Sequence, residues 1–157
     1  VPAGGEPLFD EPLAPVAHPR VAQALARGES SPLLEFDDTR PWFQWRHWFD
    51  DAAWKQRGRQ VLHFNQYDQV VQAALAGQGL AIGRIELLQP LIDGEQLAIA
   101  DIPCTPMKSP NSAWLLLADE TPREEVQQVA EWIRLEAAQV RRWARAAGAA
   151  ARQASGR

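Results

Sequence analysis

The pattern of apolar and polar positions is most regular between residues 63 and 83. Residues 67–75 carry apolar side chains at helical spacing, which predicts an amphipathic helix. Gly77 and Gly79 follow the last apolar position and predict the end of this helix, because glycine adopts left-handed backbone freely. Residues 80–82 are all apolar and predict a short strand. The pattern is therefore strand, helix, glycine stop and strand, which is typical of α/β proteins.

The remaining pattern predicts further elements of both kinds. Two prolines, Pro12 and Pro15, in residues 8–17 restrict that segment to an edge or crossover strand. We expect other strands at 33–36, 60–64, 96–100 and 113–117, and helices at 21–26, 39–53 and 84–92.

Two of the helices have distinct sequence signals. The helix expected at 39–53 has Pro41 in its first turn and tryptophans at 42, 45 and 48 on one face, which are expected in the core. The last helix is expected to begin with Thr121 as its cap and Pro122 at its first position. We expect it to keep helical character until Gly148.

The start of the helix at Asn65 is the first candidate for a binding site. Asn65 and Asp68 have the spacing of a capping box. The first N–H groups of a helix lack partners and carry the positive end of its dipole, so Asn65, Gln66 and Tyr67 could hold a carboxylate. In the alternative interpretation Asn65 only caps the helix, which contributes about 1 kcal/mol, and Tyr67 packs beneath it.

Composition and charge exclude several classes of function. The chain has 157 residues, 46% of them hydrophobic, which fits one globular domain. Five of its 16 basic residues follow residue 137, so the rest holds 11 against 20 acidic residues and is a poor DNA-binding surface. The single cysteine, Cys104, favours a reducing compartment. We find neither a signal peptide nor a membrane span, so we expect a cytoplasmic protein with no membrane contact.

The sequence lacks the motifs of enzymes and of metal or cofactor sites. There is no Gly-x-Ser-x-Gly elbow, His-Glu-x-x-His motif or phosphate-binding loop, and the three histidines are scattered. The run GQGLAIG follows a helix and precedes a strand, the reverse of the order in a dinucleotide site. We therefore expect no enzyme, no cofactor and no metal.

Four stretches together resemble the effector-binding domain of LysR-type transcriptional regulators: FNQYDQVVQAALAGQGLAIG, EPLFDEPLAPVAHP, SPLLEFDDTRPWFQWRHWF and SAWLLLADETPREEVQQVAEWIRLEA. The resemblance covers roughly residues 6–137 and implies an α/β, periplasmic-binding-protein-like (type 2) fold with a nearly complete second subdomain and a partial first subdomain. It implies a crossover segment at 1–16, the second subdomain at 17–100, a return strand and helix at 101–137, and an arginine- and alanine-rich tail at 138–157. The winged helix-turn-helix of such regulators does not precede Val1, so we expect an N-terminally truncated form.

The resemblance also implies a function. The chain would be the sensor part of a LysR-type regulator, which binds a small-molecule effector, forms homo-oligomers, and meets DNA only through the missing N-terminal domain. His63, Phe64 and Trp42 join the candidate effector contacts, although a strand histidine and a core tryptophan are the simpler interpretations. Two alternatives stay open. One is a solute-binding module without a role in transcription; the other is a non-functional remnant that exposes Val126, Val129 and Ile133.

Overall fold

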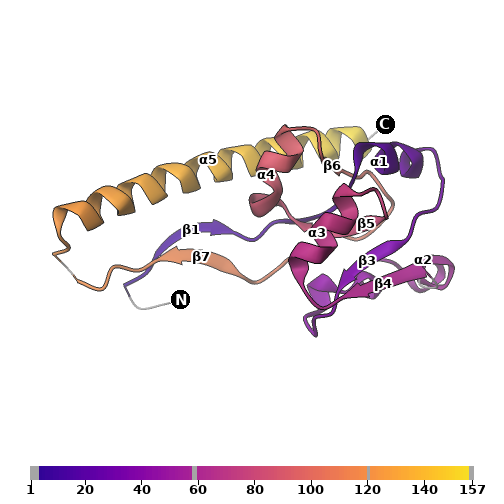
Figure 1. The fold of residues 1–157 in the computed structure, drawn as a ribbon, viewed down its shortest axis with the longest axis horizontal. Coiled ribbons are helices and arrows are strands. Elements are labelled where there is room, and N and C mark those ends of the chain that lie inside the picture. The colour runs from indigo at the N-terminus through magenta and orange to yellow at the C-terminus, as the bar shows by residue number, and fades with distance from the viewer. Residues whose placement is uncertain (1–3, 58–59, 120, 156–157) are drawn as a thin grey trace.

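The computed structural model describes residues 4–57, 60–119 and 121–155 (Figure 1). Strands and helices alternate along most of the chain, and the α/β class expected from the sequence is confirmed. The elements in chain order are β1 (Glu6–Asp10), β2 (Leu13–Ala17), α1 (Pro19–Ala26), β3 (Leu33–Phe36), the 3₁₀ turns η1 (Pro41–Phe43) and η2 (Trp45–His47), α2 (Asp51–Arg57), β4 (Val61–Phe64), α3 (Tyr67–Leu75), β5 (Leu80–Arg84), α4 (Ile85–Asp93), β6 (Ala98–Ile99), β7 (Ser112–Leu115) and α5 (Glu124–Ser155).

The larger sheet has five strands in the order β4-β3-β5-β2-β6. Strand β3 runs parallel to β4 and β5, with Leu33 opposite both Val61 and Leu80. Strand β2 runs antiparallel to β5 and to β6. Because β3, β4 and β5 are parallel, their C-terminal ends meet at one edge of the sheet. We call this edge the carboxyl edge, and the five strands with α1–α4 the sheet unit.

The predicted strand at 8–17 is two strands, and its second half is not at an edge. It divides into β1 and β2 around Glu11, and β2 has neighbours on both sides. Pro15 is tolerated inside the sheet because β6 is short and pairs only with Val16 and Ala17. The carbonyl of Pro15 accepts a hydrogen bond from Ala100 N, and the missing N–H of the proline leaves no donor unpaired.

The prediction of one helix at 39–53 is wrong. Residues 41–47 form two 3₁₀ turns separated by the extended Gln44, and an α-helix begins only at Asp51. Trp45 explains the break, because its backbone N donates to Glu35 Oε2 at 2.6 Å and its indole Nε1 donates to Leu34 O at 2.9 Å. These tertiary hydrogen bonds replace those of a regular helix. Trp45 and Trp48 are nevertheless fully buried, as expected of core residues.

Two core clusters cover the two faces of the larger sheet. Trp45, Trp48, Phe43 and Phe49 pack on one face around Leu33 and Leu80. The cluster on the other face is formed by residues of β2, β3, α3, β5 and α4 together with Leu97: Val16, Leu34, Val70, Ala73, Ala74, Ala81, Ile85, Leu88 and Leu97. Gly77 ends α3 with φ 73°, as the glycine stop predicted. A Cβ on Gly79 would lie 2.4 Å from Pro32 O, so only glycine permits this approach.

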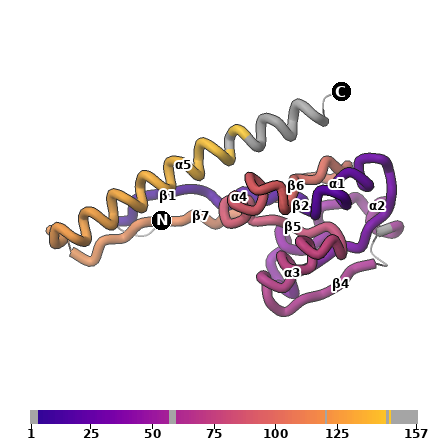
Figure 2. The backbone as a smooth tube through the Cα atoms, turned by 45° about the horizontal axis from the view of Figure 1, so that its top comes forward, coloured from indigo at the N-terminus to yellow at the C-terminus, as the bar shows by residue number. Residues whose placement is uncertain are grey.

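Strands β1 and β7 form a separate antiparallel pair, and α5 lies along it (Figures 1 and 2). Arg134 Nε donates to Glu6 Oε2 at 2.8 Å, and Arg141 Nη1 donates to Leu8 O. We call β1, β7 and the first half of α5 the β1/β7 unit. It extends away from the sheet unit, so the molecule is elongated (Figure 2).

Both predicted ends of the last helix are wrong. Helix α5 begins at Glu124, so Pro122 lies before the helix and Thr121 is not its cap. Gln127 Nε2 donates to Pro122 O at 2.7 Å and connects this entry segment to the first turn. The helix continues to Ser155, beyond Gly148, because the alanine-rich sequence outweighs the roughly 1 kcal/mol cost of one glycine.

Candidate functional site

The carboxyl edge brings together three loops that carry polar and aromatic side chains. Strand β3 leads to Asp38 and the 3₁₀ turns, β4 leads to Asn65 and α3, and β5 leads to Arg84 and α4. Ligands of α/β proteins bind outside the carboxyl ends of parallel strands. Most of the residues expected from the sequence to contact a ligand therefore come together at this edge.

The Asn65 capping box is not formed. The residue at the helix boundary is Gln66, whose backbone is extended at φ −135° and ψ 137°, and no side chain caps the first turn. Asn65 and Gln66 are both exposed. The helix starts one residue later than the motif suggested, because the hydroxyl of Tyr67 is held by β5. The amides at the start of α3 thus lack a side-chain cap.

Asn65→Ala is expected to change the free energy of unfolding by less than about 0.5 kcal/mol, as for other exposed positions without a cap contact. Urea denaturation of the variant and the parent chain measures this directly. A loss near 1 kcal/mol would show that Asn65 caps the helix in solution.

The hydroxyl of Tyr67 is hydrogen-bonded to the backbone of β5 and does not extend into solvent. Its hydroxyl accepts from Arg84 N at 2.7 Å and lies 3.4 Å from Ile82 O, to which it donates. Burial raises the pKa of Tyr67 to about 12, so the phenol keeps its proton at neutral pH. The ring contacts Phe36 edge-on, with 6.1 Å between centroids, and lies 6.4 Å from Phe43. Tyr67 therefore joins α3, β5 and the 3₁₀ turns.

Trp42 belongs to the same aromatic group through Phe43, with 6.4 Å between their ring centroids. Its indole Nε1 is buried and has no hydrogen-bond partner among the described residues. The guanidinium of Arg40 lies 4.8 Å from the centroid of Phe43 and 6.0 Å from that of Trp42. Asp38 binds Arg40 through both carboxylate oxygens, at 2.8 and 2.6 Å.

His63 and Phe64 lie at the end of β4 and face opposite sides of the sheet. Phe64 packs on the cluster around α3. His63 is exposed, with its Nδ1 3.6 Å from Glu35 Oε1. Burial raises the pKa of Glu35, although the hydrogen bond from Trp45 N and the nearby His63 oppose this shift. His63 thus lies beside a carboxylate on the tryptophan-bearing face, away from Tyr67.

A charged cluster that sequence analysis missed lies where the two units meet. We call Glu11, Arg84, Glu86, Ser109 and Asn111 the junction cluster. Arg84 Nε lies 2.5 Å from Glu11 Oε1 and 4.0 Å from Glu86 Oε1. Glu11 Oε2 accepts from Ser109 Oγ and, at 2.9 Å, from Asn111 Nδ2. One carboxylate therefore connects both crossing segments to the start of α4.

The two glutamates of the junction cluster differ in their protonation. Burial tends to raise the pKa of Glu11, but hydrogen bonds from Ser109 and Asn111 and the charge of Arg84 outweigh it and lower that pKa. Glu86 is also buried, and its Oε2 has no hydrogen-bond partner among the described residues. Burial raises the pKa of Glu86 to about 7. Glu11 is therefore ionised at neutral pH, whereas Glu86 titrates there.

The sequence did contain a signal for this cluster. Arg84 is the last residue of β5 and Glu86 comes soon after it, much as Asn65 and Gln66 follow β4. Equivalent positions after neighbouring parallel strands converge, so the same argument applies to them. Glu11, Ser109 and Asn111 carried no such signal, because nearly 100 residues separate the two segments.

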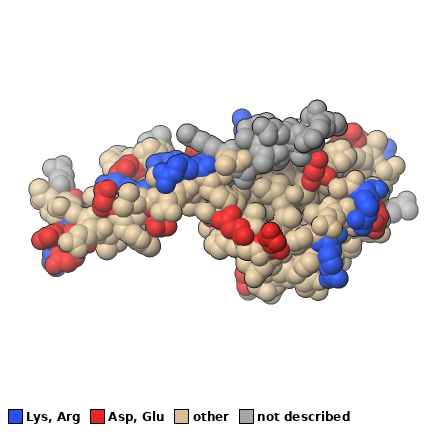
Figure 3. Space-filling view, turned by 90° about the horizontal axis from the view of Figure 1, so that it is seen from above, with Lys and Arg blue, Asp and Glu red and all other residues tan. Residues whose placement is uncertain are grey.

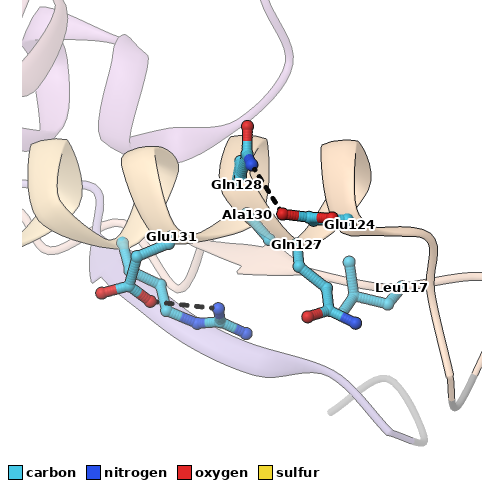
Figure 4. Close-up of a pocket in the computed structure, with 7 residues that line it drawn as sticks. Leu117, Glu124, Gln127, Gln128, Ala130 and Glu131 are labelled. Atoms are coloured by element: carbon cyan, nitrogen blue, oxygen red, sulfur yellow. Dashed lines mark hydrogen bonds and ion pairs between the residues drawn. The ribbon is translucent and has the colours of Figure 1, made fainter.

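A hollow of about 420 Å³ lies elsewhere, along α5. It is open, and Figure 4 shows its lining side chains on one face of the helix and on Leu117 beyond β7. Its one cation, Arg134, already pairs with Glu6 and Glu131. The surface drawn in Figure 3 carries acidic and basic side chains in small separate groups, with no continuous basic surface among the residues described there.

The described residues contain no group of three or more His, Cys, Asp or Glu side chains that could hold a metal ion. Within the same residues, no helix is both long and apolar enough to span a membrane.

Residues 3–138 match the model of the LysR substrate binding domain. The chain belongs to this family. This match covers most of the chain and confirms the resemblance on which the sequence analysis depended. The LysR substrate binding domain is a regulatory ligand-binding domain and not a known class of enzyme.

Solved structures of LysR effector domains share the fold. The effector domain of the transcriptional regulator AmpR from Pseudomonas aeruginosa is 20% identical, with a TM-score of 0.54, over 90% of this chain and 70% of that one. The AmpR effector binding domain from Citrobacter freundii is 18% identical, with a TM-score of 0.50, over 86% of this chain and 68% of that one. These likenesses confirm the periplasmic-binding-protein-like fold of this LysR domain. No curated protein matches the sequence.

Proposed function

We propose that this chain is the sensor portion of a LysR-type regulator and that its carboxyl edge binds a small-molecule effector. The main support for this proposal is the position of Arg84. Its side chain is about one-third exposed, and the ion pairs that it forms with Glu11 and Glu86 involve its Nε. A partly exposed guanidinium at the end of a parallel strand suits a carboxylate or another planar acceptor.

The sequence-derived candidates complete the proposed site. Asn65 and Gln66 supply exposed amide groups at the start of α3, and the uncapped amides of that helix favour negative charge. Tyr67, Phe64 and Trp42 supply apolar and aromatic surface, and His63 lies at the rim. Tyr67 acts here as a positioning residue, because its hydroxyl holds the backbone N of Arg84.

The wider regulatory role follows the family. We propose that residues 17–100 are the second subdomain, that 1–16 and 101–137 cross to and belong to the first, and that 138–157 are an appended tail. Effector bound between the subdomains would change their relative orientation and so the pairing of homo-oligomers. DNA would be contacted by a separate helix-turn-helix, in the cytoplasm.

One observation favours a second candidate, a remnant without sensor function. Helix α5 exposes four large apolar side chains, Val126, Val129, Trp132 and Leu135, with exposed fractions between 46% and 61%. Such a surface promotes association. Gel filtration separates the candidates, because a sensor elutes as a discrete monomer or dimer and a remnant aggregates.

Arg84→Gln is expected to weaken effector binding at least about tenfold, as the loss of a charge-assisted hydrogen bond would. A panel of amino acids and of mono- and dicarboxylates is first screened by thermal shift, since a ligand of the folded state raises Tm. Each hit is then titrated calorimetrically against the parent, Arg84→Gln, Asn65→Ala and a control, Arg27→Gln. Arg27 is an exposed arginine at the end of α1 that pairs with Glu29.

The proposal fails if no compound in the panel raises Tm, or if a hit binds Arg84→Gln and Arg27→Gln equally well. Weaker binding to Asn65→Ala as well would place the ligand between α3 and α4.

A further inference from the structure

Helix α5 continues beyond the part of the chain that matches the LysR family. The match ends at residue 138, whereas the helix continues to Ser155. Just beyond the matched part, at Trp143, α5 is in contact with α4 of the sheet unit.

Trp143 makes the contact with the sheet unit. Its indole Nε1 donates to Asp93 Oδ1, at the end of α4, at 2.7 Å. Its ring packs against the core cluster that contains Ile85 and Leu88 of α4. The hydrogen bond is charge-assisted, which is the stronger kind.

The same helix is also attached to the other unit. Arg134 pairs with Glu6 and Arg141 with the carbonyl of Leu8, both on β1. Arg141 lies two positions before Trp143, and Arg134 lies nine positions before it, which is about 13 Å of helix. A continuous helix over that length transmits orientation, because its backbone hydrogen bonds resist bending.

Without this helix the units would be joined by the two crossing segments alone. Those segments pass the junction cluster, where Glu11 connects them to Arg84. Connections of this kind are typical hinges, since a few residues can absorb the change in backbone angles. The contact between Trp143 and Asp93 is a third attachment, away from the crossing segments. It restricts rotation of the β1/β7 unit relative to the sheet unit.

We propose that residues 134–143 of α5 are a strut that fixes the angle between the β1/β7 unit and the sheet unit, and that Trp143 is its releasable end. The strut limits how far the units open or close. This inference concerns the chain without ligand and does not depend on the proposed effector site.

The test measures the distance between the units. Spin labels are placed by an unnatural ketone amino acid at two exposed positions, Gln69 on α3 and Glu125 on α5, so that Cys104 stays unmodified. Pulsed electron paramagnetic resonance then gives the distribution of distances between the two labels in the parent chain, in Trp143→Ala and in Asp93→Ala. The control is Trp132→Ala, which removes the same residue type from the same helix at a position that is 61% exposed.

The strut predicts a single narrow distribution for the parent and for Trp132→Ala. It predicts that Trp143→Ala and Asp93→Ala shift or broaden the distribution by more than about 2 Å, the scale of domain rearrangements. Amide exchange within α4 should also accelerate about tenfold in both variants, as a lost charge-assisted hydrogen bond implies.

The proposal is overturned if both variants keep the narrow distribution of the parent, or if the parent itself is broad. Should Trp143→Ala fail to fold, Trp143→Phe keeps the ring packing and removes only the donor. The proposal then depends on that variant and Asp93→Ala, which must both move the distribution.

Discussion

Glu11→Ala is expected to lower the free energy of unfolding by about 3 kcal/mol, the low end of the range for removing one partner of a buried ion pair. The Glu11 side chain is only 5% exposed and accepts from Ser109 and Asn111 while pairing with Arg84. Its loss leaves these groups without their acceptor. The value is near the low end because Arg84 is 36% exposed, and water compensates part of its charge.

Urea denaturation at pH 7 measures this change, with Glu6→Ala as the matched control. Glu6 also pairs with an arginine, Arg134, but both side chains are substantially exposed, so its removal should cost at most about 1 kcal/mol. Equal losses in the two variants would contradict a special role for Glu11. Glu11→Gln should fall between them, because its amide oxygen still accepts hydrogen bonds but carries no charge.

Glu86→Gln is expected to stabilise the fold at pH 8 by up to about 3 kcal/mol and to have a much smaller effect at pH 5. Burial raises the pKa of Glu86 from 4.5 to about 7, and each unit of difference corresponds to about 1.4 kcal/mol. Gln has the shape of the protonated acid and carries no charge at any pH. It therefore avoids the cost of ionising a buried carboxylate.

The sign of this pH dependence follows from which state binds the proton more tightly. The folded chain holds the Glu86 proton more tightly than the unfolded chain, so this group favours folding most below pH 4.5. The contribution is lost as pH rises from there through about 7. Glu11, with a lowered pKa, has the opposite dependence and loses its contribution as pH falls.

The free energy of unfolding is measured for the parent and for Glu86→Gln at intervals from pH 5 to 8. The difference between the two values at each pH gives the contribution of Glu86, because the other titrating groups contribute equally to both. Glu95→Gln, at an exposed position just after α4, serves as the control for replacing a carboxylate with an amide outside the buried cluster. A flat difference curve for Glu86→Gln would show that water reaches its carboxylate.

Much of the local structure could be predicted because its causes are local. The mainly apolar segment Leu33–Phe36 forms a strand over the predicted residues, and Gly77 ends α3 as expected. The family resemblance also followed from the chain itself and is confirmed by the match over residues 3–138.

The errors have tertiary causes. The Asn65 cap is absent because the hydroxyl of Tyr67 is bound to β5 and moves the helix start to Tyr67. The helix expected around Trp45 is replaced by 3₁₀ turns because Glu35 and Leu34 accept the hydrogen bonds of Trp45. Partners distant in sequence outweighed local preference in both cases.

The sequence by itself determined most of the strands and helices, the burial of Trp45 and Trp48, and the family. These depend on side-chain spacing and on backbone preferences that act over a few residues. Only the tertiary structure decided that Arg84 lies between Glu11 and Glu86 and that Trp143 reaches Asp93. Both depend on how the two units are placed relative to each other, and contacts between such distant positions leave no period or motif in the sequence.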